Sequence, residues 1–282
     1  MDTAQIRTFI AVAQTGSFLG AADVVHVTQS TVSARIRALE DELRVSLFNR
    51  GKKGASLTAA GVRFLKTATA MAQLWDQARL DVGLADDLVV SLRVGAQVSL
   101  WDGFMIPWLA WMQREAPEIA IQATMSDPIA LTQKLEEGAL DVAVLYRPQH
   151  RSGFKAREIF NEEIIMVTSD MASKDPVGSS YILTYWGPEF QRDHALHFPK
   201  MITPSLSMDL GTLGINLLVR SPGTAYFPRR IAQPHLDKGH MKVVEGAPVF
   251  KYASYAVISE TLDEAYGKIV LQGLKSTAMF LR

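Results

Sequence analysis

The spacing of apolar residues in the first 45 positions limits the fold of this chain more than any other feature. Between Thr3 and Gln14 apolar side chains recur at i, i+3, i+4 and i+7; they are Ile6, Phe9, Ile10 and Ala13. This period predicts an amphipathic helix that ends at Gly16. Ser17 is a suitable N-cap for a second, short helix over residues 18–25, and a tight turn follows over residues 26–28.

A third helix is predicted from Gln29 to about Leu43, because apolar residues recur there at spacings of 4, 3 and 4. They are Val32, Ile36, Leu39 and Leu43. A polar, donor-rich opposite face of this size enters the major groove of DNA with its N-terminus first in helix-turn-helix proteins. Here the polar face carries Gln29, Ser30, Thr31, Ser33, Arg35 and Arg37.

The segment after this helix is predicted to form a basic β-hairpin. Two short apolar edges, Leu47-Phe48 and Leu57, enclose a turn rich in glycine and lysine. The whole chain has a formal net charge of zero, yet no Asp or Glu occurs from Leu43 to Trp75. A local positive field therefore remains over this region, although an ordinary solvated charge run is the alternative. Its cations are Arg44, Arg50, Lys52, Lys53, Arg63 and Lys66.

Helix, short helix, turn, polar-faced helix and basic hairpin are, in this order, the parts of a winged helix-turn-helix, and the residues resemble the LysR family of bacterial transcription regulators. The matching positions are Phe9, Gly16-Ser17-Phe18, Ala21-Ala22, Thr28-Gln29-Ser30, Val32-Ser33, Ile36, Leu39-Glu40, Leu47-Phe48, Arg50, Leu57-Thr58 and Ala60-Gly61. Two positions depart from the family pattern. Arg44 replaces the usual glycine after the third helix, and Ala34 lacks the long polar side chain that many members carry.

The resemblance implies DNA contacts for the polar face of the third helix and for the hairpin, which would act as the wing. The expected contacts are Gln29, Ser30, Thr31, Ser33, Arg35, Arg37, Arg50, Lys52 and Lys53. Simpler roles remain open for some of them. Ser30 and Thr31 could merely belong to the first helical turn, Ser33 could be a neutral surface residue, and Arg37 could pair with Asp41.

A long helix is predicted from Thr58 to about Ala85, which contains no proline and carries an apolar stripe at alternating spacings of 4 and 3. The stripe consists of Phe64, Ala68, Met71, Trp75, Ala78 and Val82. We interpret it as a dimerisation seam; packing within its own domain is the alternative. A two-fold dimer would place two third helices in successive major grooves about 34 Å apart, on a pseudo-palindromic operator. The family also forms tetramers.

Beyond Asp86-Asp87, strand-like and helix-like segments alternate, which predicts a mostly parallel α/β sheet. The resemblance implies a two-lobed effector domain similar to periplasmic solute-binding proteins. The expected division is a DNA-binding domain over 1–58, a linker helix over 59–88 and a regulatory domain over 89–282. Lobe I would take about 89–161 and 257–282, and lobe II about 162–256.

A small-molecule effector is expected between the lobes, because ligands of open α/β sheets bind beyond the carboxyl ends of strands, near helix N-termini. Ser99 follows the first strand in such a place, although it could simply cap a helix. Asp127 is interpreted as a helix cap before Pro128, with Ser126 as the nearby candidate contact. The full set of expected effector contacts is Ser99, Leu100, Trp101, Ser126, Tyr146, Thr203, Pro204, Ser205 and Tyr226.

Other protein classes fit the sequence less well. Motifs for phosphate loops, nucleophile elbows and HExxH zinc sites are absent, so no enzyme is predicted. His194 and His197 are interpreted as structural histidines, and no metal or cofactor is expected. There is no cysteine, no long apolar run and no secretory pattern at the N-terminus, which favours a cytoplasmic protein without a membrane partner. A solute-binding protein and an architectural DNA-binding protein that needs no effector remain alternatives.

Overall fold

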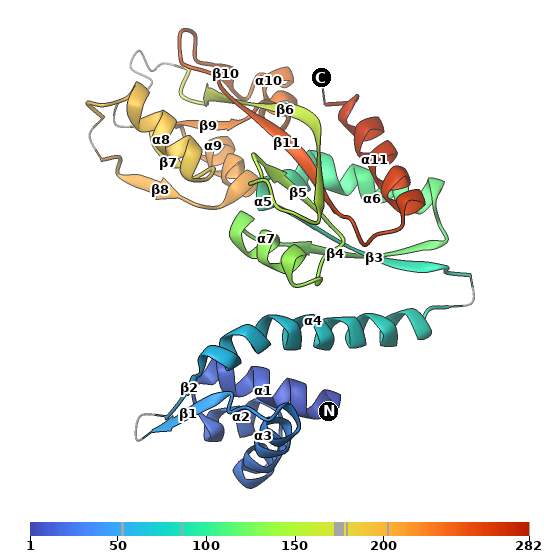
Figure 1. Cartoon of the computed structure of the whole chain (residues 1–282). Helices are drawn as coiled ribbons and strands as arrows, with labels where there is room; N and C mark the ends of the chain where they lie inside the picture. Colours follow the sequence, from blue (N-terminus) through green and yellow to red (C-terminus); the bar gives the residue numbers. More distant parts are fainter. Residues whose placement is uncertain (52–53, 86, 172–177, 179, 202, 282) are drawn as a thin grey trace. The chain divides into compact units, whose positions relative to one another are not determined.

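The computed structural model describes residues 1–51, 54–85, 87–171, 178, 180–201 and 203–281 (Figure 1). The chain divides into two compact units. The first comprises Met1–Ser91 with Gln133–Ala139, and the second comprises Leu92–Thr132 with Leu140–Arg282. Among the described residues, no helix combines the length and the apolar character that crossing a membrane requires.

The first unit begins with three helices and a β-hairpin, followed by a long helix. Their bounds are α1 (Thr3–Thr15), α2 (Phe18–Val24), α3 (Gln29–Leu43), β1 (Phe48–Gly51), β2 (Gly54–Leu57) and α4 (Ala59–Val82). The apolar faces of these helices and of the hairpin pack into one core. In this core the centroid of the Phe9 ring lies 5.2 Å from that of Phe48 and 5.0 Å from that of Phe64. The helix-turn-helix and hairpin prediction is confirmed to within one or two residues at each boundary.

Local hydrogen bonds explain where these helices begin. The Asp2 side chain accepts from the backbone N–H of Gln5, and the Gln5 side chain accepts in return from that of Asp2. Ser17 caps α2 by accepting from the N–H of Gly20 at 3.2 Å. Thr28 caps α3 by accepting from the N–H of Thr31 at the same distance. Each cap satisfies a helix N–H that has no partner inside the helix.

Arg44, which departs from the family pattern, is the C-cap residue of α3. This residue adopts a left-handed conformation with φ 54° and ψ 34°, and its N–H bonds back to the carbonyls of Glu40 and Asp41. A side chain in this region is strained, whereas glycine is not. The helix therefore ends where the family pattern has glycine, although arginine occupies the position.

We expect Arg44→Gly to stabilise the first unit by about 0.5–1 kcal/mol, because relief of left-handed strain exceeds the added freedom of the unfolded chain. Urea unfolding followed by circular dichroism would measure the change. Gly16 has a similar φ of 64°, and a Cβ added there would meet only an ordinary contact of 3.6 Å. The opposite change, Gly16→Ala, should therefore lower the stability, and a stabilising Gly16→Ala would contradict the argument.

One seven-stranded sheet organises the second unit, in the order β10-β6-β11-β5-β3-β4, with β9 paired to the end of β6. The strands are β3 (Val90–Ala96), β4 (Ile119–Met125), β5 (Val142–Tyr146), β6 (Phe154–Thr168), β9 (Thr224–Pro228), β10 (Lys242–Val243) and β11 (Phe250–Ser259). A separate parallel pair joins β7 (Ile182–Thr184) and β8 (Leu206–Met208).

The sheet is mixed, which corrects the expectation of a mostly parallel one. β3 and β5 run parallel, but β11 is antiparallel to both β5 and β6, and β9 and β10 are antiparallel to β6. The reason is that β6 and β11 are long strands that run in opposite directions through the whole unit. They join two groups of elements: lobe I, with β3 to β5, and lobe II, with β7 to β10.

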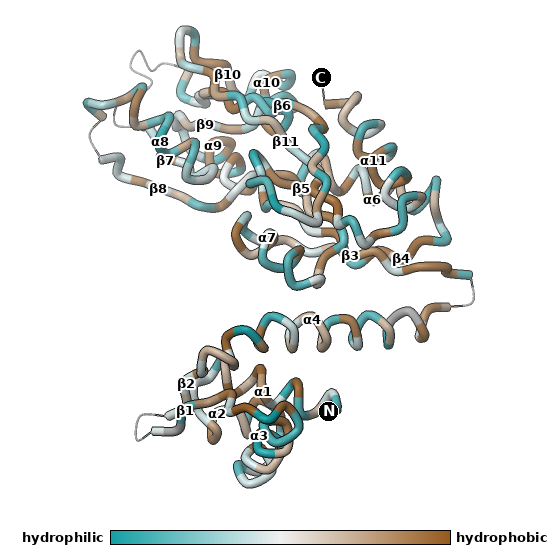
Figure 2. The backbone as a smooth tube through the Cα atoms, in the orientation of Figure 1, coloured by the Kyte–Doolittle hydropathy of each residue, from teal (hydrophilic) through white to brown (hydrophobic). Residues whose placement is uncertain are grey.

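The helices divide between the same lobes. Lobe I carries α5 (Val98–Leu100), a kinked turn η1 (Trp101–Met105), α6 (Ile106–Glu115), α7 (Pro128–Glu136) and α11 (Glu264–Ala278). Lobe II carries α8 (Pro188–His197), a 3-10 turn η2 (Gly211–Gly214), α9 (Ile215–Arg220) and α10 (Arg229–Asp237). The central strands β3 and β5 are largely apolar (Figure 2), and their side chains form the core of lobe I.

Aromatic side chains fill part of lobe II. The Tyr226 ring lies 5.6 Å from Phe190 and 5.1 Å from Phe250. Nε2 of the buried His194 lies 2.6 Å from the Tyr181 hydroxyl, and burial lowers the pKa of His194. Nδ1 of His197 instead lies 2.8 Å from the Asp193 carbonyl. The histidine pair thus has separate structural partners, as its sequence interpretation proposed.

Candidate nucleic-acid interface and interlobe cluster

The N-terminus of α3 presents the polar residues that the sequence singles out. Gln29 and Ser30 are exposed, while Val32 and Ile36 on the opposite face are fully buried. The hydroxyls of Ser30 and Thr31 lie 2.8 and 2.9 Å from the Thr28 hydroxyl. Both residues therefore take part in the helix cap, and Gln29 is the exposed side chain of this turn that has no assigned structural role.

Farther along α3 the candidates differ in their surroundings. Arg35 is half-buried, and its Nη1 donates to the Thr8 hydroxyl on α1 at 3.3 Å. This bond gives Arg35 a structural role that the sequence did not predict. Ser33 is half-buried, and Arg37 is exposed. Within the part of the chain that the structure describes, no ion pair joins Arg37 to Asp41.

The hairpin is held in place by backbone contacts. The Glu40 carboxylate accepts from the N–H of Leu47 at 2.7 Å and from that of Phe48 at 3.1 Å. The N–H of Ala55 donates to the Gly16 carbonyl at 2.7 Å, which ties β2 to the turn before α2. Arg50 lies on β1 opposite Ala55, whereas Lys52 and Lys53 lie outside the described residues.

The apolar stripe of α4 separates into two parts. Phe64, Ala68 and Met71 pack into the core beneath α1, with Ala68 fully buried. Trp75 and Val82 remain 49% and 89% exposed, and Ala78 is also exposed. Because α4 has 24 residues and α1 only 13, their lengths are about 36 and 20 Å, so the stripe continues past the helix that covers its first half.

A compact polar cluster, which we call the interlobe cluster, involves Ser99, Asp102, Tyr146, Glu162 and Arg230. Nε of Arg230 donates to the Glu162 carboxylate at 2.7 Å, and the Tyr146 hydroxyl donates to the same carboxylate at 3.1 Å. The guanidinium also donates to the backbone carbonyls of Ser99 and Asp102. The side chains of Arg230 and Glu162 are each only 4% exposed.

The ionisation of this cluster follows from its burial and charge. Burial and the nearby Glu162 carboxylate raise the pKa of the Tyr146 hydroxyl far above its usual range, so it stays neutral and donates. Burial opposes the charge of Arg230, but Glu162 outweighs it and the pKa of the guanidinium is raised. The cluster therefore places the Arg230 guanidinium directly against the buried Glu162 carboxylate, with a neutral phenol beside them.

The other expected effector residues are not all in this cluster. Leu100 is buried in the core, and the indole N–H of Trp101 donates to the Ala96 carbonyl at 3.1 Å. Asp127 caps α7 by accepting from the N–H groups of Ile129 and Ala130, as expected, and Ser126 is half-buried nearby. Thr203 and Ser205 are exposed and Pro204 is half-buried, and this segment directly precedes strand β8.

Tyr226 corrects a second expectation. Its ring is fully buried in the aromatic core of lobe II, and its hydroxyl donates to the Pro248 carbonyl at 3.0 Å. A residue so enclosed is a core residue and offers no surface to an effector. The reason is tertiary: β9 lies between β6 and the helices of lobe II, so every residue of the strand is buried.

Sequence reasoning missed Glu162 and Arg230, although a signal was present. Each belongs to a doublet of like charges, Glu162-Glu163 and Arg229-Arg230, and Glu162-Glu163 directly precedes the apolar end of β6. Side chains alternate across a strand, so one acid of the first doublet had to face the interior. The other member of each doublet pairs outside the cluster, where Nε of Arg229 lies 2.8 Å from Glu163.

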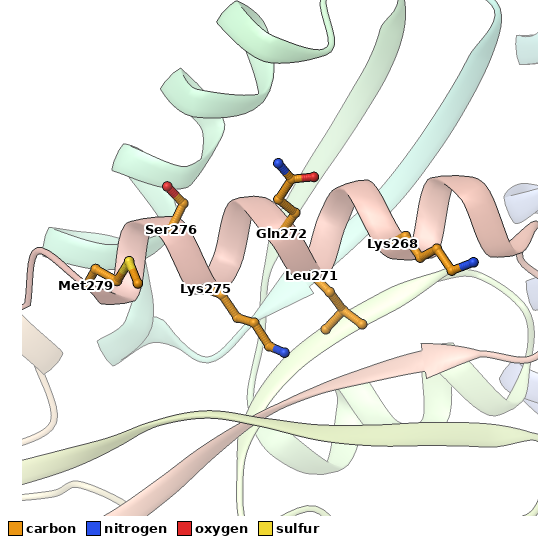
Figure 3. A pocket seen from close by; sticks show the side chains of 6 residues that line it. All are labelled: Lys268, Leu271, Gln272, Lys275, Ser276 and Met279. Carbon is orange, nitrogen blue, oxygen red and sulfur yellow. The ribbon is translucent and has the colours of Figure 1, made fainter.

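A further hollow of about 520 Å³ lies along α11 and contains none of the predicted site residues (Figure 3). Its lining comes from one face of that helix: Lys268, Leu271, Gln272, Lys275, Ser276 and Met279.

Family models and known proteins agree with this architecture. The model described as bacterial regulatory helix-turn-helix protein, lysR family, matches residues 3–62, and the LysR substrate binding domain matches residues 85–264. The HTH-type transcriptional regulator HdfR of Yersinia enterocolitica is 29% identical over 278 residues, which cover 94% of this chain and 92% of the relative. HdfR of Salmonella typhimurium is 28% identical and covers 94% of each chain.

Solved structures share the fold over nearly the whole chain. CbnR, a LysR family transcriptional regulator, has a TM-score of 0.65 at 19% identity and covers 99% of both chains. Full-length OxyR from Pseudomonas aeruginosa has a TM-score of 0.62 at 22% identity and covers 98% of both. DarR from Vibrio fischeri, solved in complex with DNA, has a TM-score of 0.59 at 19% identity and covers 98% of both.

The matching families and relatives are transcription regulators and not enzymes. The substrate-binding model alone spans more than half of the chain, and the helix-turn-helix model covers most of the remainder. This protein therefore belongs to the LysR family of transcription regulators.

Proposed function

We propose that this protein binds a specific operator through α3 and the hairpin, as a homodimer, and responds to a small-molecule effector between its two lobes. The observation that supports DNA binding best is the N-terminus of α3. Its apolar face is fully buried while Gln29 and Ser30 are exposed, which is the arrangement of a helix that reads base edges. Exposed Arg37 and the basic hairpin would contact phosphates.

The stretch from Leu43 to Trp75, which contains no Asp or Glu, supports the same assignment of the DNA-binding surface. It covers the hairpin and the first two-thirds of α4, so its positive field would act close to the DNA backbone. We propose the domain division 1–58, 59–88 and 89–282, with α4 as the dimerisation helix. Dimers that pair into tetramers, a pseudo-palindromic operator and a cytoplasmic location belong to the same proposal.

For the effector, the supporting observation is that Ser99 and Tyr146 lie in one polar cluster with residues of the other lobe. Ligands that bind at such a place change the relation between two lobes, and hence the spacing of the DNA-binding units. An architectural DNA-binding protein that needs no effector is the second candidate, and the response to small molecules separates the two.

The test is a titration of the purified protein against its own upstream intergenic DNA at two salt concentrations, with and without a metabolite library. Gln29→Ala is expected to weaken specific binding by about 1–3 kcal/mol, or about 5- to 150-fold, because a side chain reading a base edge is lost. Gln272→Ala is the matched control, since Gln272 is exposed on α11 in the second unit and is not among the proposed contacts.

Each outcome of this titration is informative. Equal operator affinity for Gln29→Ala and the parent protein would show that α3 does not read the bases. Specific binding that no metabolite alters would favour the architectural function. Binding that one metabolite changes would identify the effector.

A further inference from the structure

The interlobe cluster contains a charged contact between elements far apart in the sequence. Arg230 is the second residue of α10 in lobe II, and its guanidinium donates to Glu162 on β6, one of the two strands that join the lobes. The same guanidinium reaches lobe I, where it donates to the carbonyls of Ser99 and Asp102. One side chain therefore connects both lobes and a joining strand.

The kink in η1 positions the Asp102 carbonyl of lobe I for its hydrogen bond with Arg230. Asp102 has ψ 131° and Gly103 has φ 72°, so the chain leaves helical geometry there and the Asp102 carbonyl turns away from the helix axis. A helical carbonyl would be used by the next turn. The kink instead presents it to Arg230, and a Cβ on Gly103 would lie only 3.2 Å from Nη1 of Arg230.

The lobes also approach closely beside this contact. A Cβ added to Gly211, at the start of η2 in lobe II, would lie 2.9 Å from Cγ1 of Val98 in lobe I. The two lobes are therefore in contact at the place where α5 begins, and the domain is closed there.

The partners of Arg230 share one chemical property: all of them accept hydrogen bonds. They are the carboxylate of Glu162 and two backbone carbonyls, and the Tyr146 hydroxyl, a nearby donor, is already bonded to Glu162. We call this group of acceptors the Arg230 seat. A buried carboxylate without a cation is costly, so an occupant with a positive charge and several N–H donors is strongly favoured.

We propose that Arg230 is a built-in latch that holds the two lobes closed, and that its seat binds guanidinium or amine cations when Arg230 is withdrawn. The contacts that hold the lobes closed all lie within one protein molecule. That opening of the lobes regulates DNA binding rests on the proposed effector function. A molecule that frees the lobes would have to compete with a tethered guanidinium, whose effective concentration is in the millimolar range.

The test compares amide hydrogen exchange of full-length variants, without DNA or effector. Arg230→Ala leaves Glu162 buried without its cation and is the sharper variant if it folds. Arg230→Ala with Glu162→Gln removes both charges, so no buried charge is left unpaired and the variant is expected to fold. The matched control is Arg229→Ala with Glu163→Gln, because these neighbours form a partly exposed pair on the same two elements, with side chains 42% and 32% exposed.

We expect the Arg230 variants to exchange about 10-fold faster or more in segments 98–105 and 211–215, while α11 keeps its protection. The control should leave both segments unchanged. Unchanged exchange in the double variant that lacks Arg230 and Glu162 would show that apolar packing closes the lobes, and the latch would be overturned.

Chemical rescue tests the seat itself. Ethylguanidinium replaces the atoms that Arg230→Ala removes, and ethylurea has nearly the same shape without the charge. Millimolar ethylguanidinium should restore slow exchange in Arg230→Ala, and ethylurea should not. Equal rescue by both, or by neither, would contradict a cation seat. Operator binding of the parent protein tests only the proposed function. If the parent protein does not bind the operator, the hydrogen-exchange and rescue results still decide whether Arg230 is a latch.

Discussion

Replacing Trp75 with glutamate is expected to disrupt the proposed homodimer and to leave the protein as monomers. The Trp75 side chain is 49% exposed on α4, beside Asp76, which pairs with Arg7 of α1, and Val82 two turns later is 89% exposed. An apolar stripe left open in this way is typical of a surface that another protein chain covers. In a two-fold interface the change occurs twice, and each copy would bury an unpaired carboxylate.

The expected loss is at least about 100-fold in dimer affinity, equivalent to about 2.7 kcal/mol. Sedimentation velocity over a range of protein concentrations would measure it. Val62→Glu introduces the same charge at a residue that is 60% exposed but lies on a different face of α4, and it should sediment like the parent. If Trp75→Glu remains a dimer, the seam is not the interface.

The structure also shows which seam residues cannot serve in this test. Ala68 was predicted to be a dimerisation residue, yet it is 0% exposed inside the core of its own unit. A charge there would unfold the unit, and monomers would result for an unrelated reason. Only substitutions in the second half of the stripe can weaken association without also unfolding the unit.

Patterns within one element predicted much of this fold. The bounds of α3 agree with the prediction because the helix period and the buried positions lie within the same fifteen residues, whereas the Thr28 cap was found only in the structure. The two departures from the family pattern were visible for the same reason. Arg44 was recognised as a departure after the third helix, but its left-handed backbone became apparent only in the structure.

Features that depend on distant contacts were not predictable in the same way. Arg230 and Glu162 are 68 residues apart, and no local period connects them. Tyr226 was read as an effector contact, but only the packing of β9 beneath the helices of lobe II shows that it is enclosed. The kink at Asp102 and Gly103 before α6 is a further example, because the carbonyl that it exposes is bound by Arg230 of the other lobe.

Gly61→Ala is expected to destabilise the first unit by about 1–3 kcal/mol, although alanine favours helices by about 1 kcal/mol over glycine. Gly61 lies in the first turn of α4, and a Cβ there would be 2.2 Å from the Leu47 carbonyl oxygen and 2.9 Å from Cδ2 of Leu57. The leucine side chain can rotate away. The carbonyl cannot, because it accepts from the N–H of Thr58 at 2.9 Å and so fixes the hairpin against α4.

The same clash should weaken operator binding, since the start of β1 must move away from α4 and the hairpin with it. Thermal unfolding and the operator titration would measure the two effects on one protein. Gly20→Ala is the matched control: it lies in α2, its Cβ would meet nothing closer than 3.4 Å, and it should be neutral or stabilising. If Gly61→Ala is as stable as Gly20→Ala, the close approach of α4 to the hairpin does not hold, and the wing would owe its position to the Glu40 carboxylate and the Gly16 carbonyl instead.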